Sequence, residues 1–304
     1  MSKALTTAII SITALTSPLY AHAETNLAAP RCVPPTHIIT LPLRDDGGYL
    51  SVPATINGHA ISMIVDTGSQ GSLITPSAVK RMKLPTDTSL RTALSGAGGV
   101  GATVPDTRIT TFQLGSLKLG SGLIAVGELP GSPLLHPPVE GLIGADVLSS
   151  FDLEFDVPHH QLTLWRADPL QGCRTPQEET RNIPAHLTSG RVTLTFTLDG
   201  IPGTALLDSG ARSHIVSLDF AHKLSLTDEQ LARDPGGIAA GIDLHPHRYY
   251  WHQFKQFTLG PTQWDHPTLT IAPLYDSVDM LLGSDWFAQH TVWISYTHQH
   301  VFIR

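Results

Sequence analysis

Two short stretches carry residue types that could perform acid–base chemistry. Residues 63–69 (MIVDTGS) and 205–211 (ALLDSGA) each place an aspartate, a hydroxyl residue and a glycine directly after an apolar run. The aspartates are Asp66 and Asp208, 142 positions apart. An apolar run of this kind indicates a buried strand, and a carboxylate at its end is costly to bury without a local reason. The pattern therefore predicts two carboxylates that act together.

A pair formed by Asp66 and Asp208 would support hydrolysis of an amide. Two carboxyl groups about 3 Å apart cannot both ionise easily, so they share one proton and titrate as a unit. The ionised member can take a proton from water while the protonated member donates to a substrate carbonyl. Glycine permits the tight loop that presents each carboxylate, and the hydroxyl residues can hold the loops rigid. The supporting residues are Thr67, Gly68, Ser69, Ser209 and Gly210.

The segments that must position these loops occur twice. In the first copy we expect two strands joined by a hairpin turn at Asn57-Gly58, then a short strand and a helix. In the second copy the turn is Asp199-Gly200. The matching segments are 49–55 with 192–197, 60–65 with 204–207, 73–74 with 215–216, 76–82 with 218–224, 98–102 with 236–240, 112–115 with 257–260, 142–148 with 281–287, and 155–164 with 294–303.

This agreement indicates a duplicated domain with a period of about 140 residues, far longer than a solenoid repeat. Two copies of one fold tend to pack about a pseudo-two-fold axis, which brings matching positions together. A single Asp-Thr-Gly is typical of a turn or a helix start. The second copy in the same context favours a site.

Composition agrees with a β-rich globular chain. Of 304 residues, 41% are apolar and only 15% are charged, with 26 Gly and 23 Pro. The net charge of −7 gives no electrostatic reason to expect nucleic acid or an anionic membrane as a partner.

The first 23 residues are expected to be a signal peptide. Lys3 precedes an apolar stretch at 4–15, and Ala21-His22-Ala23 fits the small-residue cleavage pattern, so the mature chain would begin at Glu24. A buried N-terminal helix is the alternative. No later run is long enough to span a membrane, so we expect a periplasmic or secreted protein. In such a compartment Cys32 and Cys173 are expected to form a disulfide, the alternative being two unpaired thiols.

The two Asp-hydroxyl-Gly loops and the hydrophobic-hydrophobic-Gly elements at 142–144 and 281–283 resemble those of the aspartic peptidases. The resemblance is to a single chain with two retropepsin-like lobes, and it covers residues 41–304. It implies an all-β fold of two tandem retropepsin-like β-barrel lobes related by a pseudo-two-fold axis, with few short helices. The expected segments are a leader or propeptide at 24–40, lobes at 41–168 and 183–304, and a linker at 169–182.

The resemblance also implies a function. Asp66 and Asp208 would be the catalytic dyad of an aspartic endopeptidase, and Thr67 and Ser209 would cross-link the active loops. Flap hairpins at 96–102 and 235–241 would close over an extended peptide or protein substrate. The flap residues are expected to be Gly98, Gly99, Gly236 and Gly237. The enzyme would be a monomer without a cofactor or a metal.

Some features depart from the family pattern or allow another interpretation. Neither flap segment carries the tyrosine of pepsin-like enzymes. Ser69 has a hydroxyl where the second copy has Ala211, and this extra donor predicts that Asp66 is the more acidic member. Asp146 and Asp285 are expected to cap short helices.

Alternative functions rest on weaker signals. His298 and His300 share a strand face and could bind a metal, although an exposed histidine-rich hairpin is the favoured interpretation. His245 and His247 could contact substrate. A catalytically inactive relative that binds peptides or proteins in the cleft is the main alternative to an enzyme. A two-carboxylate glycosidase is disfavoured by the Asp-Thr-Gly context and by the duplication.

Overall fold

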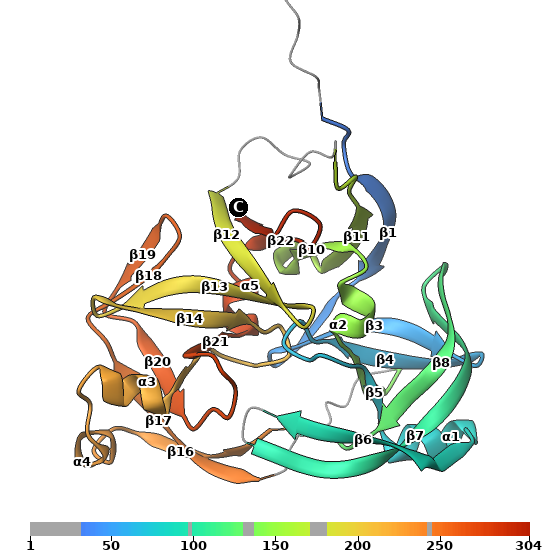
Figure 1. Ribbon diagram of the computed structural model, residues 1–304, viewed down its shortest axis with the longest axis horizontal. Helices are drawn as coiled ribbons and strands as arrows, with labels where there is room; N and C mark the ends of the chain where they lie inside the picture. Colours follow the sequence, from blue (N-terminus) through green and yellow to red (C-terminus); the bar gives the residue numbers. More distant parts are fainter. Residues whose placement is uncertain (1–31, 97–98, 130–136, 171–180, 242–244) are drawn as a thin grey trace, which may run out of the picture. The chain divides into compact units, whose positions relative to one another are not determined.

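The fold is built almost entirely from strands. The computed structural model describes residues 32–96, 99–129, 137–170, 181–241 and 245–304. Within these ranges the chain forms 23 strands, five short α-helices and one 3-10 helix (Figure 1). The all-β class with few short helices is thereby confirmed. No helix in the described ranges is long and apolar enough to cross a membrane.

The first copy forms an eight-stranded sheet in the order β2-β3-β4-β9-β5-β8-β7-β6. An additional pairing joins β3 to β7, so the sheet curls back on itself. The elements of this copy are β2 (Arg44–Asp46), β3 (Tyr49–Ile56), β4 (His59–Val65), β5 (Leu73–Ile74), α1 (Pro76–Met82), β6 (Thr86–Gly96), β7 (Gly99–Leu114), β8 (Leu117–Val126), β9 (Val139–Ile143) and α2 (Ala145–Leu148).

The second copy uses the same arrangement of pairs. The hairpin β13–β14 corresponds to β3–β4, and the parallel pair β14–β21 corresponds to β4–β9. Its elements are β12 (Arg181–Thr188), β13 (Arg191–Leu198), β14 (Ile201–Leu207), β15 (Ile215–Ser217), α3 (Leu218–Lys223), α4 (Asp228–Leu231), β16 (Gly236–Ala240), β17 (Pro246–Gln253), β18 (Gln256–Leu259), β19 (Thr262–Asp265), β20 (Thr268–Ala272), β21 (Met280–Leu282) and α5 (Ser284–Phe287).

Both expected hairpin turns form. Asn57 and Gly58 have φ values of 49° and 80°, and Asp199 and Gly200 have 47° and 83°. Two consecutive residues with positive φ define the type I′ turn that matches the twist of the flanking strands. The turn residues therefore fix the register of the two strands that lead to the aspartates.

A third group of strands joins the two copies. The strands β10 and β22 pair antiparallel, with Leu153 opposite Ile294, so one sheet contains strands of both copies (Figure 1). Around this pairing the order is β1-β11-β10-β22-β23-β12. The elements not yet given are β1 (Thr36–Pro42), β10 (Asp152–Asp156), the 3-10 helix η1 (Val157–His159), β11 (Gln161–Arg166), β22 (Thr291–Ser295) and β23 (His300–Ile303).

The N-terminal part of this sheet was not expected. The strand β1 begins at Thr36, inside the segment 24–40 that the sequence indicated to be a leader without strands, and it pairs with β11 along an edge. Proline at its end and a register shift between His37 and Ile39 interrupt the two-residue alternation, which explains why no strand was predicted. Burial of Leu41 anchors the strand in the core.

Some expectations fall outside the described residues. These are the signal peptide at 1–23, the flap residue Gly98, and Cys173 with most of the linker at 169–182. The Cys32–Cys173 disulfide therefore stays a prediction.

Candidate active site

Asp66 and Asp208 each follow the last residue of a buried strand. The strand β4 ends at Val65 and β14 ends at Leu207, and both strands have a parallel neighbour. Parallel pairing buries a strand on both faces, which accounts for the continuous apolar runs. The first residue of each loop stays tied to that neighbour, since Asp66 N donates to Ile143 O and Asp208 N to Leu282 O, each at 2.9 Å.

The two loops are cross-linked by four hydrogen bonds. Thr67 Oγ1 donates to Leu207 O at 2.7 Å and accepts from Ser209 N at 3.0 Å. Symmetrically, Ser209 Oγ donates to Val65 O at 2.6 Å and accepts from Thr67 N at 3.1 Å. Both hydroxyl residues are fully buried. Because every donor and acceptor is used within this set, the loops cannot separate without leaving buried polar groups unpaired.

Each carboxyl group is held by its own loop and touches the glycine of the other. Asp66 Oδ1 accepts from Gly68 N and Ser69 N, and Asp208 Oδ1 accepts from Gly210 N and Ala211 N, all at 2.9–3.1 Å. A Cβ added to Gly68 would lie 2.3 Å from Asp208 Cγ, and one added to Gly210 would lie 2.4 Å from Asp66 Cγ. Glycine is therefore required at both positions by contact across the pair.

The two carboxyl groups are hydrogen-bonded to each other and titrate together. Burial and the neighbouring Asp208 charge raise the pKa of Asp66 well above its usual range. Burial also raises the pKa of Asp208, but there it is opposed by backbone N–H donors, by the bond from Asp66 and by the Arg191 charge. Both side chains keep part of their surface accessible. This arrangement suits a pair that shares one proton, and water can reach it.

The expected role of the Ser69 hydroxyl as an extra donor to Asp66 is wrong. Its hydroxyl donates to Gly71 O at 2.8 Å and not to the carboxylate. Asp66 and Asp208 thus receive the same set of donors from their loops, two backbone N–H groups each. The Ser69 hydroxyl therefore gives no reason for Asp66 to be the more acidic member, and burial with the Asp208 charge raises the pKa of Asp66.

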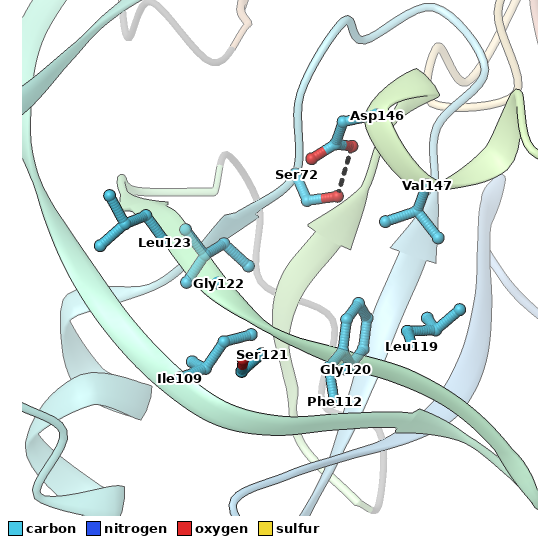
Figure 2. Close-up of a pocket in the computed structure, with 11 residues that line it drawn as sticks. Ser72, Ile109, Phe112, Leu119, Gly120, Ser121, Gly122, Leu123, Asp146 and Val147 are labelled. Carbon is cyan, nitrogen blue, oxygen red and sulfur yellow. Dashed lines mark hydrogen bonds between the residues drawn. The ribbon is translucent and has the colours of Figure 1, made fainter.

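The expected role of Asp146 and Asp285 as helix caps is also wrong. The cap positions belong to Gly144 and Gly283, and neither helix receives a side-chain cap. The carboxylates instead hold the chain that follows each active loop. Asp146 accepts from Ser72 Oγ at 2.7 Å, beside a pocket of about 130 Å³ between β8 and α2 (Figure 2). Neither active-loop aspartate lines this pocket, which is too small for a peptide.

In the second copy a histidine takes the place of Ser72 as the partner of the aspartate. His214 Nδ1 lies 2.7 Å from Asp285 Oδ1, and His214 N donates to the other carboxylate oxygen at 3.1 Å. His214 follows Asp208 by six positions, as Ser72 follows Asp66. Both copies therefore fasten the same place in the loop by different chemistry.

The flap glycines are placed differently in the two copies. Gly99 opens β7 at the turn of the β6–β7 hairpin. Gly236 and Gly237 open β16 at the end of the β16–β17 hairpin that is farthest from its turn. A Cβ on Gly236 would lie 2.0 Å from Tyr249 O. The second glycine pair thus marks close packing against β17, so the expected correspondence of 236–240 with 98–102 does not extend to their places in the two hairpins.

Three residues near the pair were missed in the sequence. Arg191 Nη1 lies 2.5 Å from Asp276 Oδ2 and donates to Gly68 O at 3.4 Å. Tyr275 precedes Asp276, and its ring lies 3.7 Å from where a Cβ of Gly99 would be. The sequence did contain a signal for Arg191. The corresponding position in the first copy, 142 residues earlier, holds Tyr49, so a cation replaces an aromatic residue in strands that otherwise match.

The histidines do not form a metal centre in the described part of the chain, where no group of three or more His, Cys, Asp or Glu side chains is arranged to hold an ion. His298 Nδ1 lies 3.2 Å from Ser295 Oγ, and His300 Nδ1 lies 2.8 Å from Asn182 Oδ1. His247 lies beside Tyr275, with 6.1 Å between ring centres.

Comparison with known proteins agrees with this geometry. The sequence model of the aspartyl protease family matches the chain twice, at residues 52–147 and 194–286. Each match contains one Asp-hydroxyl-Gly loop and one buried strand pair, and ends within one of the short helices α2 and α5. No curated protein shows significant similarity to the sequence. The two matches cover more than half of the chain, which therefore belongs to the aspartyl protease family.

Proposed function

We propose that the chain is an exported aspartic endopeptidase in which Asp66 and Asp208 activate a water molecule. The observation that carries this proposal is the hydrogen-bonded carboxyl pair, held by two cross-linked loops and partly open to solvent. Burying two carboxyl groups side by side is costly, and titratable groups with strongly perturbed pKa values gather at functional sites.

The pair can supply both proton transfers of peptide hydrolysis. The ionised carboxylate accepts a proton from water, whose oxygen forms a bond to the peptide carbonyl carbon. The protonated carboxyl donates its proton to the carbonyl oxygen. When the C–N bond then breaks, the carboxyl group that took the proton from water donates it to the leaving nitrogen, and the other carboxylate takes a proton from a hydroxyl of the tetrahedral intermediate as the C=O bond re-forms. The pair is then singly protonated as at the start.

The two hairpins β6–β7 and β16–β17 supply apolar surface suited to a peptide or protein substrate. Val100 and Ile238 are 78% and 76% exposed, which is unusual for residues of their kind. Large exposed apolar side chains on hairpins can cover apolar side chains of an extended peptide. The remaining features of the proposal are export through residues 1–23, a Cys32–Cys173 disulfide, and action as a monomer.

Cleavage of an unfolded protein between pH 3 and pH 7 tests the activity. We expect the wild type to cut and Asp66→Asn and Asp208→Asn each to lose at least about 10³-fold in kcat, because either change removes one of the two proton transfers. The matched control is Asp265→Asn, which alters an exposed carboxylate on β19, outside both active loops and both hairpins, and should leave the rate unchanged.

Two further results would contradict the proposal. The first is an intact substrate at every pH with a peptide nevertheless bound, which would indicate an inactive binding module. The second concerns export. Protein recovered from the exported fraction should have the mass of a chain that begins at Glu24. Its mass should also increase by two hydrogens on reduction of the proposed disulfide. A mass that includes residues 1–23 would exclude the proposed export route.

A further inference from the structure

The two halves of the site differ in charge. Arg191 opens β13, and the matching position at the start of β3 is Tyr49. Likewise Arg212, four positions after Asp208, corresponds to Gln70 in the first copy. Arg212 is exposed, and its guanidinium lies over the Tyr49 ring at 5.3 Å and donates to Gly47 O. Of the two arginines, Arg191 is therefore the one on the side of the carboxyl groups.

The position of Arg191 is fixed by contacts with both copies. Its side chain is only 13% exposed and forms an ion pair with Asp276, which is 22% exposed. Its Nη1 also donates to Gly68 O, and Gly68 lies against the carboxyl group of Asp208. The antiparallel register of β13 and β14, with Thr193 opposite Leu206, continues to Arg191 opposite Asp208, so the guanidinium lies on the Asp208 side of the pair. There its charge lowers the pKa of Asp208 and acts through little water.

The surroundings of Asp66 have the opposite character. The Tyr296 hydroxyl is buried, has no hydrogen-bond partner among the described residues, and is close enough to respond to the charges of Asp66 and Asp152. Burial, together with those two charges, raises the pKa of Tyr296, so the phenol stays neutral. Asp152 is itself buried and accepts from Ser295 Oγ at 2.8 Å and Thr297 N at 3.0 Å. The groups identified on this side of the pair are thus a neutral phenol and a carboxylate.

We propose that Arg191 is a positioning residue that places the negative charge of the pair on Asp208 and keeps the shared proton on Asp66. Asp208 then acts as the base toward water, and Asp66 as the acid toward the carbonyl oxygen. Asp276 holds the guanidinium in place and reduces its charge only in part. The assignment of base and acid rests on the proposed function, whereas the position of the proton does not.

Titration of the single-carboxyl variants tests the assignment without any need for catalysis. In Asp66→Asn only Asp208 titrates at the pair, and in Asp208→Asn only Asp66 does. Carboxyl ¹³C NMR should give the lower midpoint for Asp208, by about 1 pH unit or more. Adding Arg191→Gln to each variant should move the Asp208 midpoint upward by a similar amount and the Asp66 midpoint much less. Arg191→Lys, which keeps the charge, should restore most of the difference.

Loss of Arg191 leaves Asp276 unpaired, so the double change Arg191→Gln with Asp276→Asn serves as a second variant that removes both charges. A lower midpoint for Asp66, or equal shifts of both midpoints on loss of Arg191, would overturn the proposal.

A rate measurement separates positioning from a structural role. In the wild type, kcat/KM should rise with pH as Asp208 ionises, and Arg191→Gln should move this acid limb to higher pH and lower the rate on it by about 10-fold. A purely structural role would lower kcat equally at every pH. If the titrations agree while the wild type cleaves nothing, the proton assignment stands and the proposed function fails.

Discussion

Gly68 and Gly210 join the two halves of the site at the scale of single residues. Each lies against the carboxyl group contributed by the other copy, so the absence of a side chain on the glycine leaves room for that aspartate. This contact explains why the motif needs glycine even though neither residue has a positive φ. Glycine is required here because the two loops lie too close together for a Cβ atom.

We predict that Gly68→Ala removes activity while the chain stays folded. The new Cβ would lie 2.3 Å from Asp208 Cγ, so the carboxyl group must move. A displacement of this size costs about 10²-fold or more in kcat. The control is Gly71→Ala three positions along the same loop, where a Cβ would meet nothing within 4 Å. Equal rates for the two variants in a cleavage assay would show that the glycine contact is unimportant.

At this scale the sequence indicates which residues matter better than it indicates their contacts. Repetition of Asp-hydroxyl-Gly is enough to select Asp66 and Asp208, because two equivalent positions in a duplicated fold meet near its axis. The direction of the Ser69 hydroxyl and the approach of Arg191 depend on side-chain geometry. That geometry is set by Gly71 O in one case and by Asp276 in the other, and neither partner lies at a repeated position.

At the scale of elements, hairpin turns were predictable and edge strands were not. Asn57-Gly58 and Asp199-Gly200 encode their turns locally, through residues that accept positive φ. By contrast, β1 is defined by its pairing with β11, where Leu41 lies opposite Leu162, and its own sequence gives little indication of a strand. The position of Gly236 and Gly237 was misjudged for a related reason, since two glycines fit a tight packing contact as well as a turn.

We predict that a chain beginning at Leu41 is much less stable than one beginning at Thr36. The shorter chain loses most of β1, including Ile38 and Ile39, which pack on the core, and the Thr40–Thr163 contact at 3.0 Å. Loss of two partly buried apolar side chains costs about 3 kcal/mol. For a chain of this size that corresponds to a fall in Tm of about 6–12 °C.

Circular dichroism of the two truncated chains checks this. Both chains lack Cys32, and a reductant keeps Cys173 from forming a disulfide between molecules. Equal Tm values would mean that β1 adds nothing, and a propeptide could then extend to Thr40. A fall in Tm would place any processing site before Thr36.

At the scale of the whole described unit, the carboxyl pair makes stability depend on pH in an unusual direction. The folded-state pKa of Asp66 is raised by burial and by the Asp208 charge. Between the ordinary aspartate pKa and this raised value, the folded chain binds more protons than the unfolded chain. The contribution of Asp66 to the free energy of unfolding is therefore fully present at acid pH and is lost as pH rises through the raised pKa.

Asp276 acts in the opposite sense. Burial alone would raise the pKa of Asp276, but the hydrogen bond and charge of Arg191 hold it below its usual range. Its contribution is present above the ordinary aspartate pKa and is lost as pH falls. The dependence of wild-type stability on pH therefore combines two opposed effects. The contribution of the Asp66–Asp208 pair is seen only by comparison with a variant.

We predict that Asp66→Asn is stabilised relative to the wild type as pH rises. Asparagine cannot ionise, so the variant is spared both the buried charge and its repulsion with Asp208. Its Tm relative to the wild type should increase by about 3 °C or more between pH 3.5 and pH 7, which corresponds to roughly 1 kcal/mol for this chain size. Thermal unfolding followed at both pH values measures the difference, with the exposed Asp265→Asn as control. A difference that stays constant with pH would show that Asp66 is not protonated in the folded chain, and the shared proton would then have to be assigned elsewhere.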